Sequence, residues 1–399
     1  MAGYTPNPRT IPTMLTGVRD PTVLTTPRVK IEMDDEMYWV LPEATPLLVM
    51  LNKVRDTEQV DNYLFQWMRM EEMPRTATVL ADVAAGATAL TVSLTEVNYF
   101  VANHVCEILE TEELVHATVV TVATGVLTIT RSLNGINKPI PAGSHISVVA
   151  PAFRDGAAKG TYQSMVEIPD FNYSQCFRRG FGHTFRALQL GVFGGKDPAT
   201  TEQQVAIEHR LDQELSLLYG TRYYEATGAA PLSMAGGLRD FVETNVWNLG
   251  GVAPTVDDFF SYMEYAMRYG DGGYMKGGSG LKYALCSSRW LTWFAQQTYP
   301  KVQYEPLQEK LGIKAQLLGT PHGDLVLVKS PILDRDHSGD MWIVDPNHAR
   351  KVVFGDYDTM LREDIETPGD ARKEKEFYAD LGWKFTSELP FGRITGLPR

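Results

Sequence analysis

The spacing of apolar residues predicts one long amphipathic helix over residues 198–228, in a chain otherwise made of short strands, short helices and glycine turns. Its apolar positions recur at helical spacing and are Ile207, Leu211, Leu215 and Leu218. The charged residues between them are Glu208, Arg210, Asp212 and Glu214. One stripe is therefore apolar and the rest polar, which is typical of a helix packed on the protein surface. Thr200 or Thr201, each followed three residues later by Gln, offers a capping-box start.

Residues 76–150 are rich in Val, Thr, Ala and Gly, and nearly every apolar run has the length of one strand. The predicted strands are 89–93, 105–109, 114–122, 126–131 and 145–149. Leu127 and Ile129 alternate with threonines, and the turn at 123–125 closes a hairpin onto the preceding strand. We expect a compact β-rich module inserted in a longer loop.

Residues 241–354 mix helical and strand patterns. Thr255 or Asp257 is placed to cap one helix, and Ser287 or Ser288 another. The expected strands are 282–286, 325–327, 340–344 and 351–354, with a short strand or turn at 241–246. The glycine-rich stretch 270–280 predicts a mobile loop. This mixture indicates an α+β domain.

Two further stretches alternate apolar and polar residues and are predicted to be strands. The first contains Tyr63, Phe65 and Trp67, and the second contains Trp383, Phe385 and Leu389. Residues 390–397 then form a turn and one more short extended piece.

Residues 1–30 contain five prolines, together with Arg9, Arg19, Arg28 and Lys30 against only Asp20. Proline removes backbone donors and restricts the preceding residue, so we expect an extended arm that needs a partner surface to be ordered. Its positive charge favours an acidic neighbour as that surface, ahead of nucleic acid.

The chain has 399 residues and a net charge of −12, so it is long enough for two or three cores and unsuited to wrapping tightly around nucleic acid or an anionic membrane. Cys106, Cys176 and Cys286 are few and far apart, which indicates reduced thiols rather than a disulfide framework. No run approaches the roughly 20 apolar residues of a membrane span, and the first residues lack the apolar core of a signal peptide.

Three histidines invite a search for a metal site. His104, His116 and His145 all fall within the β-rich module. Their sequence neighbourhoods differ, and no carboxylate stands at a ligand-like spacing, so we expect no metal there.

Two loops resemble known ligand motifs incompletely. Residues 334–340, with aspartates at 334, 336 and 340 and Asp345 beyond them, resemble a calcium loop without its bidentate Glu, and we interpret them as a hairpin turn. Residues 191–197, GVFGGKD, lack the hydroxyl residue of a phosphate loop. No GxSxG elbow or carboxylate pair stands out either, so we expect no catalytic, cofactor-binding or metal-binding residues and no enzyme.

Three local sequences carry a resemblance to a known family. They are AGGLRDF at 235–241, TPHGDLVLV at 320–328, and PGD at 368–370 leading to GRITGL at 392–397. Their order and spacing resemble the major capsid proteins of tailed bacteriophages, whose fold is shared with herpesvirus capsids and bacterial encapsulins. The closest likeness is to the branch with a small β-domain in the extended loop.

The resemblance implies an α+β tailed-phage major capsid fold with an inserted all-β domain. The implied divisions are an N-terminal arm at 1–54, an extended loop at 55–75 and 151–175, the inserted domain at 76–150, a peripheral domain with the spine helix at 176–240 and 355–399, and an axial domain at 241–354. In some relatives a Lys and an Asn on neighbouring subunits form a covalent crosslink. Lys159 lies in the corresponding region, but no Asn partner can be matched.

The implied function is self-assembly as hexamers and pentamers into an icosahedral virion shell around phage double-stranded DNA, in the host bacterial cytoplasm. The implied partners are copies of the chain, a separate scaffolding protein and a portal, and a decoration protein remains open. We expect no sequence-specific contact with the packaged DNA and no membrane. The alternatives are an encapsulin-like compartment with a protein cargo and, from another class, a metal-dependent hydrolase using Asp334 and Asp336.

Overall fold

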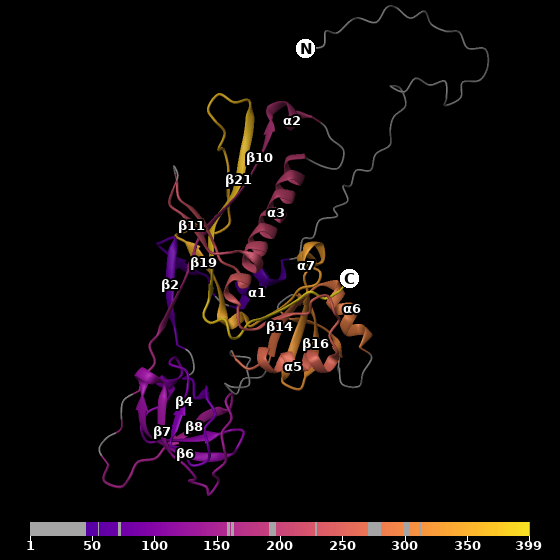
Figure 1. Ribbon diagram of the computed structural model, residues 1–399. Coiled ribbons are helices and arrows are strands. Elements are labelled where there is room, and N and C mark those ends of the chain that lie inside the picture. Colours follow the sequence, from indigo (N-terminus) through magenta and orange to yellow (C-terminus); the bar gives the residue numbers. More distant parts are fainter. Residues whose placement is uncertain are drawn as a thin grey trace, which may run out of the picture. The chain divides into compact units, whose positions relative to one another are not determined.

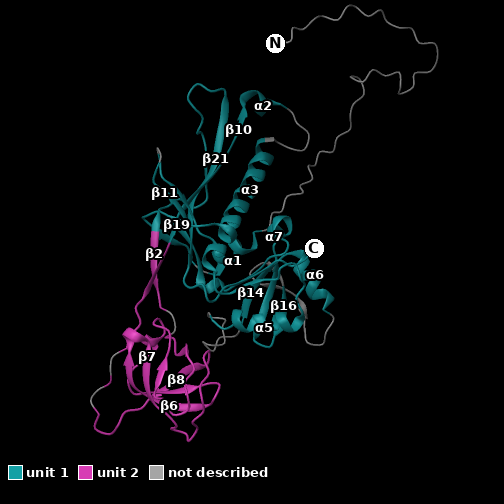
Figure 2. Cartoon of the chain, viewed as in Figure 1, with its two compact units in different colours: residues 1–64, 172–399 teal, residues 65–171 magenta. Residues whose placement is uncertain are grey.

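The computed structural model describes residues 45–54, 56–70, 73–157, 160, 163–190, 197–227, 230–269, 281–297, 304–310 and 313–398. The chain forms two compact units, residues 1–64 with 172–399 and residues 65–171 (Figure 2). Four features considered above lie outside the described residues: the proline-rich arm, the glycine-rich loop 270–280, positions 191–196 and Lys159.

A five-stranded sheet in the first unit packs against the long helix (Figure 1). Its strands are β1 (Glu58–Val60), β19 (Ala349–Phe354), β21 (Arg372–Phe385) and β10 (Gln175–Thr184), in that order, with β20 (Met360–Arg362) also beside β21. β1 runs parallel to β19, and the other pairs are antiparallel. The long helix, α3 (Asp197–Tyr219), lies along β10 and β21.

The long helix is confirmed, but its ends and its polar face differ from the prediction. It begins at Asp197, so Thr200 and Thr201 lie inside it, and it ends at Tyr219 rather than at residue 228. Leu211 is buried as expected, but Leu215 is only half-buried. Glu214, expected in solvent, is fully buried because the helix α1 (Pro46–Val54) packs on that side of α3.

Two glycines allow the chain to pack closely at the end of α3. The Gly237 N–H donates to the Gly220 carbonyl oxygen at 2.9 Å. A Cβ on Gly237 would collide with the carbonyl oxygens of Ser216 and Leu217. In the GGL sequence, the backbone at Gly237 therefore lies too close to the end of α3 for any residue with a Cβ atom. It leads into a short helix, α4 (Leu238–Phe241), which ends at the first residue of the stretch 241–246, where a short strand or turn was expected and a bend lies at residues 244–245.

A seven-stranded sheet forms the other part of the first unit. Its order is β13 (Val246–Asn248), β22 (Gly392–Thr395), β18 (Met341–Val344), β14 (Leu281–Cys286), β17 (Gly323–Lys329), β16 (Ile313–Thr320) and β15 (Tyr304–Lys310). The helices α5 (Val256–Ala266) and α6 (Ser288–Gln296) begin after the predicted caps, Thr255 and Ser287, whose side chains accept backbone N–H groups. Phe259, Trp290 and Ile343 are among the residues of its buried core.

Four expectations about this unit are corrected. β22, expected in the peripheral range 355–399, pairs with β13 and β18 in the seven-stranded sheet. β19, expected in the axial range 241–354, pairs with β21 in the five-stranded sheet. An alternating pattern specifies which face of a strand is buried and not which strand lies beside it, so the sequence could not decide either pairing. The strand predicted from Trp383 is the end of β21, which begins at Arg372.

The fourth correction concerns the predicted hairpin turn at residues 334–340. Its first residues belong to a short helix, α7 (Pro331–Asp336). Pro331 is compatible with a first helical turn, and Ile332 and Leu333 are buried.

The remaining short elements of the first unit connect these layers. They are α2 (Phe185–Gln189), the paired strands β11 (Tyr223–Glu225) and β12 (Leu232–Met234), and the 3-10 helix η6 (Pro346–His348).

The second unit contains a six-stranded antiparallel sheet with its own core. The order is β3 (Thr76–Thr78), β8 (His145–Pro151), β5 (His104–Ile108), β6 (Glu113–Thr121), β7 (Val126–Thr130) and β4 (Ala89–Thr91). The five strands predicted between residues 89 and 149 are confirmed to within two residues. An isolated bridge between Val79 and Val92, each one residue beyond an edge strand, joins the two edges of the sheet. Leu127 and Ile129 are buried in its core.

Two 3-10 helices, η3 (Val97–Tyr99) and η4 (Val122–Thr124), connect these strands. The strand predicted around Phe65 is β2 (Leu64–Arg69), which pairs with β9 (Ile168–Tyr173) in a two-stranded ribbon.

Candidate functional site

The three histidines of the β-rich unit each make a separate contact. The Val101 N–H donates to Nδ1 of His104 at 3.3 Å, and Nε2 of His116 lies 3.2 Å from the Ala152 carbonyl oxygen. Nδ1 of His145 lies 2.7 Å from Oε1 of Glu110. Among the described residues, no group of three or more His, Cys, Asp and Glu side chains is placed to hold a metal ion.

The aspartates of the calcium-like sequence are engaged in separate structural contacts. The Asp334 carboxylate accepts a hydrogen bond from the Ser288 hydroxyl at 2.7 Å and so ties α7 to the start of α6. Asp336 pairs with Arg335 at 2.8 Å. Asp345 caps η6. The described structure therefore does not bring these carboxylates together as ligands.

Arg178 and Arg179 are adjacent on β10, so their side chains lie on opposite faces of the strand, and each forms ion pairs with acidic side chains. Arg178 contacts Glu376 of β21 at 2.8 Å. Arg179 contacts Asp212 of α3 at 2.6 Å and also pairs with Glu208. The Arg179 pairs connect the long helix to the five-stranded sheet, whereas the Arg178 pair joins two strands of that sheet.

Asp340 joins the end of α3 to the seven-stranded sheet, a connection that the sequence did not reveal. Its carboxylate accepts a hydrogen bond from the Tyr219 hydroxyl at 3.1 Å and from Nη2 of Arg393 at 3.2 Å. The Arg393 guanidinium lies 4.8 Å from the ring centre of Trp342. Burial, followed by the Asp340 charge, raises the pKa of Tyr219, so its hydroxyl remains a donor.

Lys282 is a second buried connection. Its Nζ donates to the carbonyl oxygens of Ala266 at 2.6 Å and Pro390 at 2.7 Å, and the side chain has no exposed surface. Burial lowers its pKa to about 8, against an opposing effect of the Asp345 charge. The lysine thereby ties β14 to α5 and to the segment that leads into β22.

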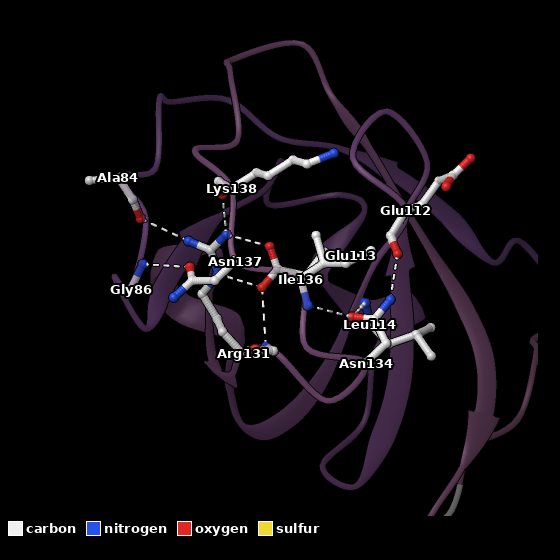
Figure 3. A network of polar contacts seen from close by, with 11 residues as sticks. Ala84, Gly86, Glu112, Glu113, Leu114, Arg131, Asn134, Ile136, Asn137 and Lys138 are labelled. Carbon is white, nitrogen blue, oxygen red and sulfur yellow. Dashed lines mark hydrogen bonds and ion pairs between the residues drawn. The ribbon is translucent and has the colours of Figure 1, made fainter.

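A polar network organises the loops of the β-rich unit (Figure 3). The Arg131 guanidinium pairs with the Glu113 carboxylate, with Nε to Oε1 at 2.9 Å, and donates to the Ala84 carbonyl oxygen at 2.8 Å. Burial raises the pKa of Glu113, but the hydrogen bonds from Arg131 and Ser132 outweigh this and hold it below its usual value. The network connects the loop that contains Ala84 to Glu113 of β6 and to Arg131, which follows β7.

The two-stranded ribbon exposes apolar side chains. The exposed apolar residues of β2, β9 and their immediate flanks include Met68, Met70, Val166, Ile168 and Phe171. The largest exposed fraction is 84%, at Val166. Two-stranded ribbons are marginally stable alone, and exposed apolar patches mark contacts with other molecules.

Comparisons with known proteins agree with a structural role. A family model described as SU10 major capsid protein matches residues 16–398. No curated protein matches. No described helix is both long enough and apolar enough to cross a membrane.

Several solved structures resemble the chain at low identity. The capsid of the native GTA particle is 7% identical with a TM-score of 0.47, covering 93% of this chain and 96% of that one. The Gordonia phage Cozz structure is 7% identical with a TM-score of 0.48, covering 93% and 92%. The holo-SrpI encapsulin complex from Synechococcus elongatus PCC 7942 is 9% identical with a TM-score of 0.42, covering 58% and 78%. Because these TM-scores lie below 0.5, the family model carries the assignment.

The match of the family model to residues 16–398 defines the class of protein as a capsid subunit. The chain belongs to the SU10 major capsid protein family, which confirms the resemblance found in the sequence. It is a structural protein of a bacteriophage virion, and copies of it form the icosahedral capsid shell.

Proposed function

We propose that the chain assembles as hexamers and pentamers into a shell around double-stranded phage DNA, and that the exposed ribbon makes contacts between subunits. The supporting observation is the set of apolar side chains on β2, β9 and their flanks. In β2 the alternation buries Phe65 and Trp67 and exposes Gln66 and Met68. A second copy that covers Met68 removes apolar surface from water, at roughly 25 cal/mol per Å².

The test is to place a charge on the exposed side of the ribbon. Met68→Asp and Val166→Asp, made separately in the full chain, should leave the circular dichroism spectrum unchanged and prevent closed shells in electron microscopy. Tyr357→Asp is the matched control, because Tyr357 is exposed but lies in the first unit, outside the ribbon. Normal shells from both ribbon variants would contradict the proposal.

Residues 76–150 are proposed as an inserted domain that stabilises the shell from its outer side, over a contact with a neighbouring subunit. The Val148 N–H donates to the Arg75 carbonyl oxygen at 2.9 Å, so the entry and exit strands lie side by side. Neighbouring ends allow a domain to be inserted without disturbing its host.

Replacing 76–150 by a short Gly-Ser linker should leave subunits that fold, with shells that melt at lower temperature or do not close. Circular dichroism, thermal melts and electron microscopy measure this. A variant that cannot fold would show that the module belongs to the main core. Shells of undiminished stability would show that it makes no contact between subunits.

The family and the net charge of the chain support proposals about its other partners. We propose assembly in the host cytoplasm with a separate scaffolding protein and a portal, and packaged DNA without sequence-specific contact, because the net charge is −12. A purely structural role is supported by the separate engagements of Asp334 and Asp336, the acids of the hydrolase alternative. A decoration protein would bind an outer surface of the finished shell.

A further inference from the structure

A groove of about 430 Å³ lies between α5 and the edge strand β13 of the seven-stranded sheet. Its lining includes Trp247 from the strand, Asn245 just before the strand, and Asp258, Ser261, Tyr262 and Tyr265 from the helix. The four helical positions share one face of α5, at i, i+3, i+4 and i+7. The neighbouring face of α5, with Phe259 and Met263, is buried in the core, so the groove is built on a fixed helix.

The aromatic side of the groove is formed in advance. The rings of Trp247 and Tyr262 stack with their centres 5.3 Å apart and their planes 26° apart. The Tyr262 hydroxyl donates to the Asn245 carbonyl oxygen at 2.6 Å, which fixes the ring against β13. Tyr265 is 60% exposed at the side of the groove. An occupant therefore meets ordered aromatic surface.

The segment that builds the groove is acidic. Residues 243–266 contain Glu243, Asp257, Asp258 and Glu264 and no Lys or Arg. All four acids are exposed. An occupant with positive charge is favoured over a neutral or acidic one.

The same chain contains a segment of matching chemistry. Residues 1–30 have five prolines, and their charged side chains are three arginines and one lysine against one aspartate. Proline-rich segments populate the polyproline II conformation, lose little entropy on binding, and dock in aromatic-lined grooves.

We propose that the groove between β13 and α5 binds the proline-rich basic segment, residues 1–30, of this capsid chain. The rings of Trp247 and Tyr265 receive its prolines, and Asp258 in the lining, with the other acids of residues 243–266, attracts its arginines. The segment can be supplied by the same copy or by a neighbouring one, and either source satisfies the proposal.

Photocrosslinking in the purified full-length protein tests the occupant. A benzoylphenylalanine group in place of Tyr265 should capture peptides from residues 1–30, identified by mass spectrometry. The same group in place of the exposed Tyr357 is the matched control and should capture at least tenfold less of that segment. Equal capture at the two positions, or capture only of other segments at position 265, would overturn the proposal.

Charge variants of the segment provide a second test, in which the groove with its crosslinker at position 265 is the same throughout and only the occupant changes. Replacing Arg9, Arg19 and Arg28 together by Glu should lower the crosslink yield at position 265 at least tenfold. Replacing the same three by Lys keeps the charge and should retain the yield. A Glu variant within twofold of the unchanged segment would overturn the proposal, and neither experiment depends on closed shells.

Discussion

The Glu214 carboxylate on the long helix α3 accepts a hydrogen bond from the backbone N–H of Leu48, 3.2 Å away in the first turn of α1. The Leu47 N–H donates to the same carboxylate at 3.4 Å. Both are N–H groups that have no partner within their own helix. Burial raises the pKa of Glu214 to about 8, although these two hydrogen bonds lower it. The attachment of α1, which follows the N-terminal arm, to α3 is therefore linked to protonation of the Glu214 carboxyl group.

This linkage predicts a pH-dependent stability. The folded pKa of about 8 lies above the unfolded value of 4.5, so the folded state binds more protons between these values. The contribution of Glu214 to the free energy of unfolding should fall as pH rises from about 4.5 to about 8. Glu214→Gln removes that contribution, so the variant should gain stability relative to the wild type as pH rises. Urea unfolding at several pH values from 5 to 8 measures the difference.

Glu264→Gln is the control for this experiment, because Glu264 is exposed on α5. Its difference from the wild type should stay nearly constant over the same pH range. A constant difference for Glu214→Gln as well would show that Glu214 is ionised throughout.

The buried stripe of α3 predicts a graded series of core variants. Leu217 is fully buried and Leu211 nearly so, whereas Leu215 is half-buried. Leu211→Ala and Leu217→Ala should each cost about 2–5 kcal/mol of unfolding free energy, and Leu215→Ala clearly less. Leu211→Asp should abolish soluble protein. Denaturant unfolding ranks the alanine variants, and equal losses at 211 and 215 would contradict the burial described.

The close contact at the end of α3 predicts that glycine is required at one position and not at another. Gly237→Ala places a methyl group against the carbonyl oxygens of Ser216 and Leu217 and should destabilise by about 1–3 kcal/mol or more. Gly180→Ala is the matched control, because its Cβ would lie 3.8 Å from the nearest atom, the Lys375 carbonyl oxygen. Thermal melts of the two variants should differ clearly.

The buried ion pair of the β-rich unit predicts a different cost from that of an exposed pair. Arg131→Met leaves the Glu113 carboxylate buried without its cation and should destabilise by about 3–5 kcal/mol. Arg372→Met breaks half-exposed contacts with Asp370 and Glu374 and should cost less than about 1 kcal/mol. Adding Glu113→Gln to Arg131→Met should recover part of the loss. A double variant no more stable than Arg131→Met would contradict an uncompensated charge as the cause.

The sequence by itself determined the strands of residues 89–149, the existence of the long helix and the caps Thr255 and Ser287. Each of these depends on local information: alternate burial along a strand, glycine at a turn, or a side-chain oxygen before a helix. The capsid resemblance also came from the order of short sequences along the chain, and the family model confirms it.

Only the tertiary structure decided how these elements combine. β22 joins the seven-stranded sheet and β19 the five-stranded one because hydrogen-bond partners are chosen among strands far apart in the chain. Glu214, on the face of α3 predicted to be solvated, is buried because α1 covers it from 166 residues away in the sequence. The helical spacing around Glu214 contains no sign of this, since the number of faces that a helix buries depends on what packs against it.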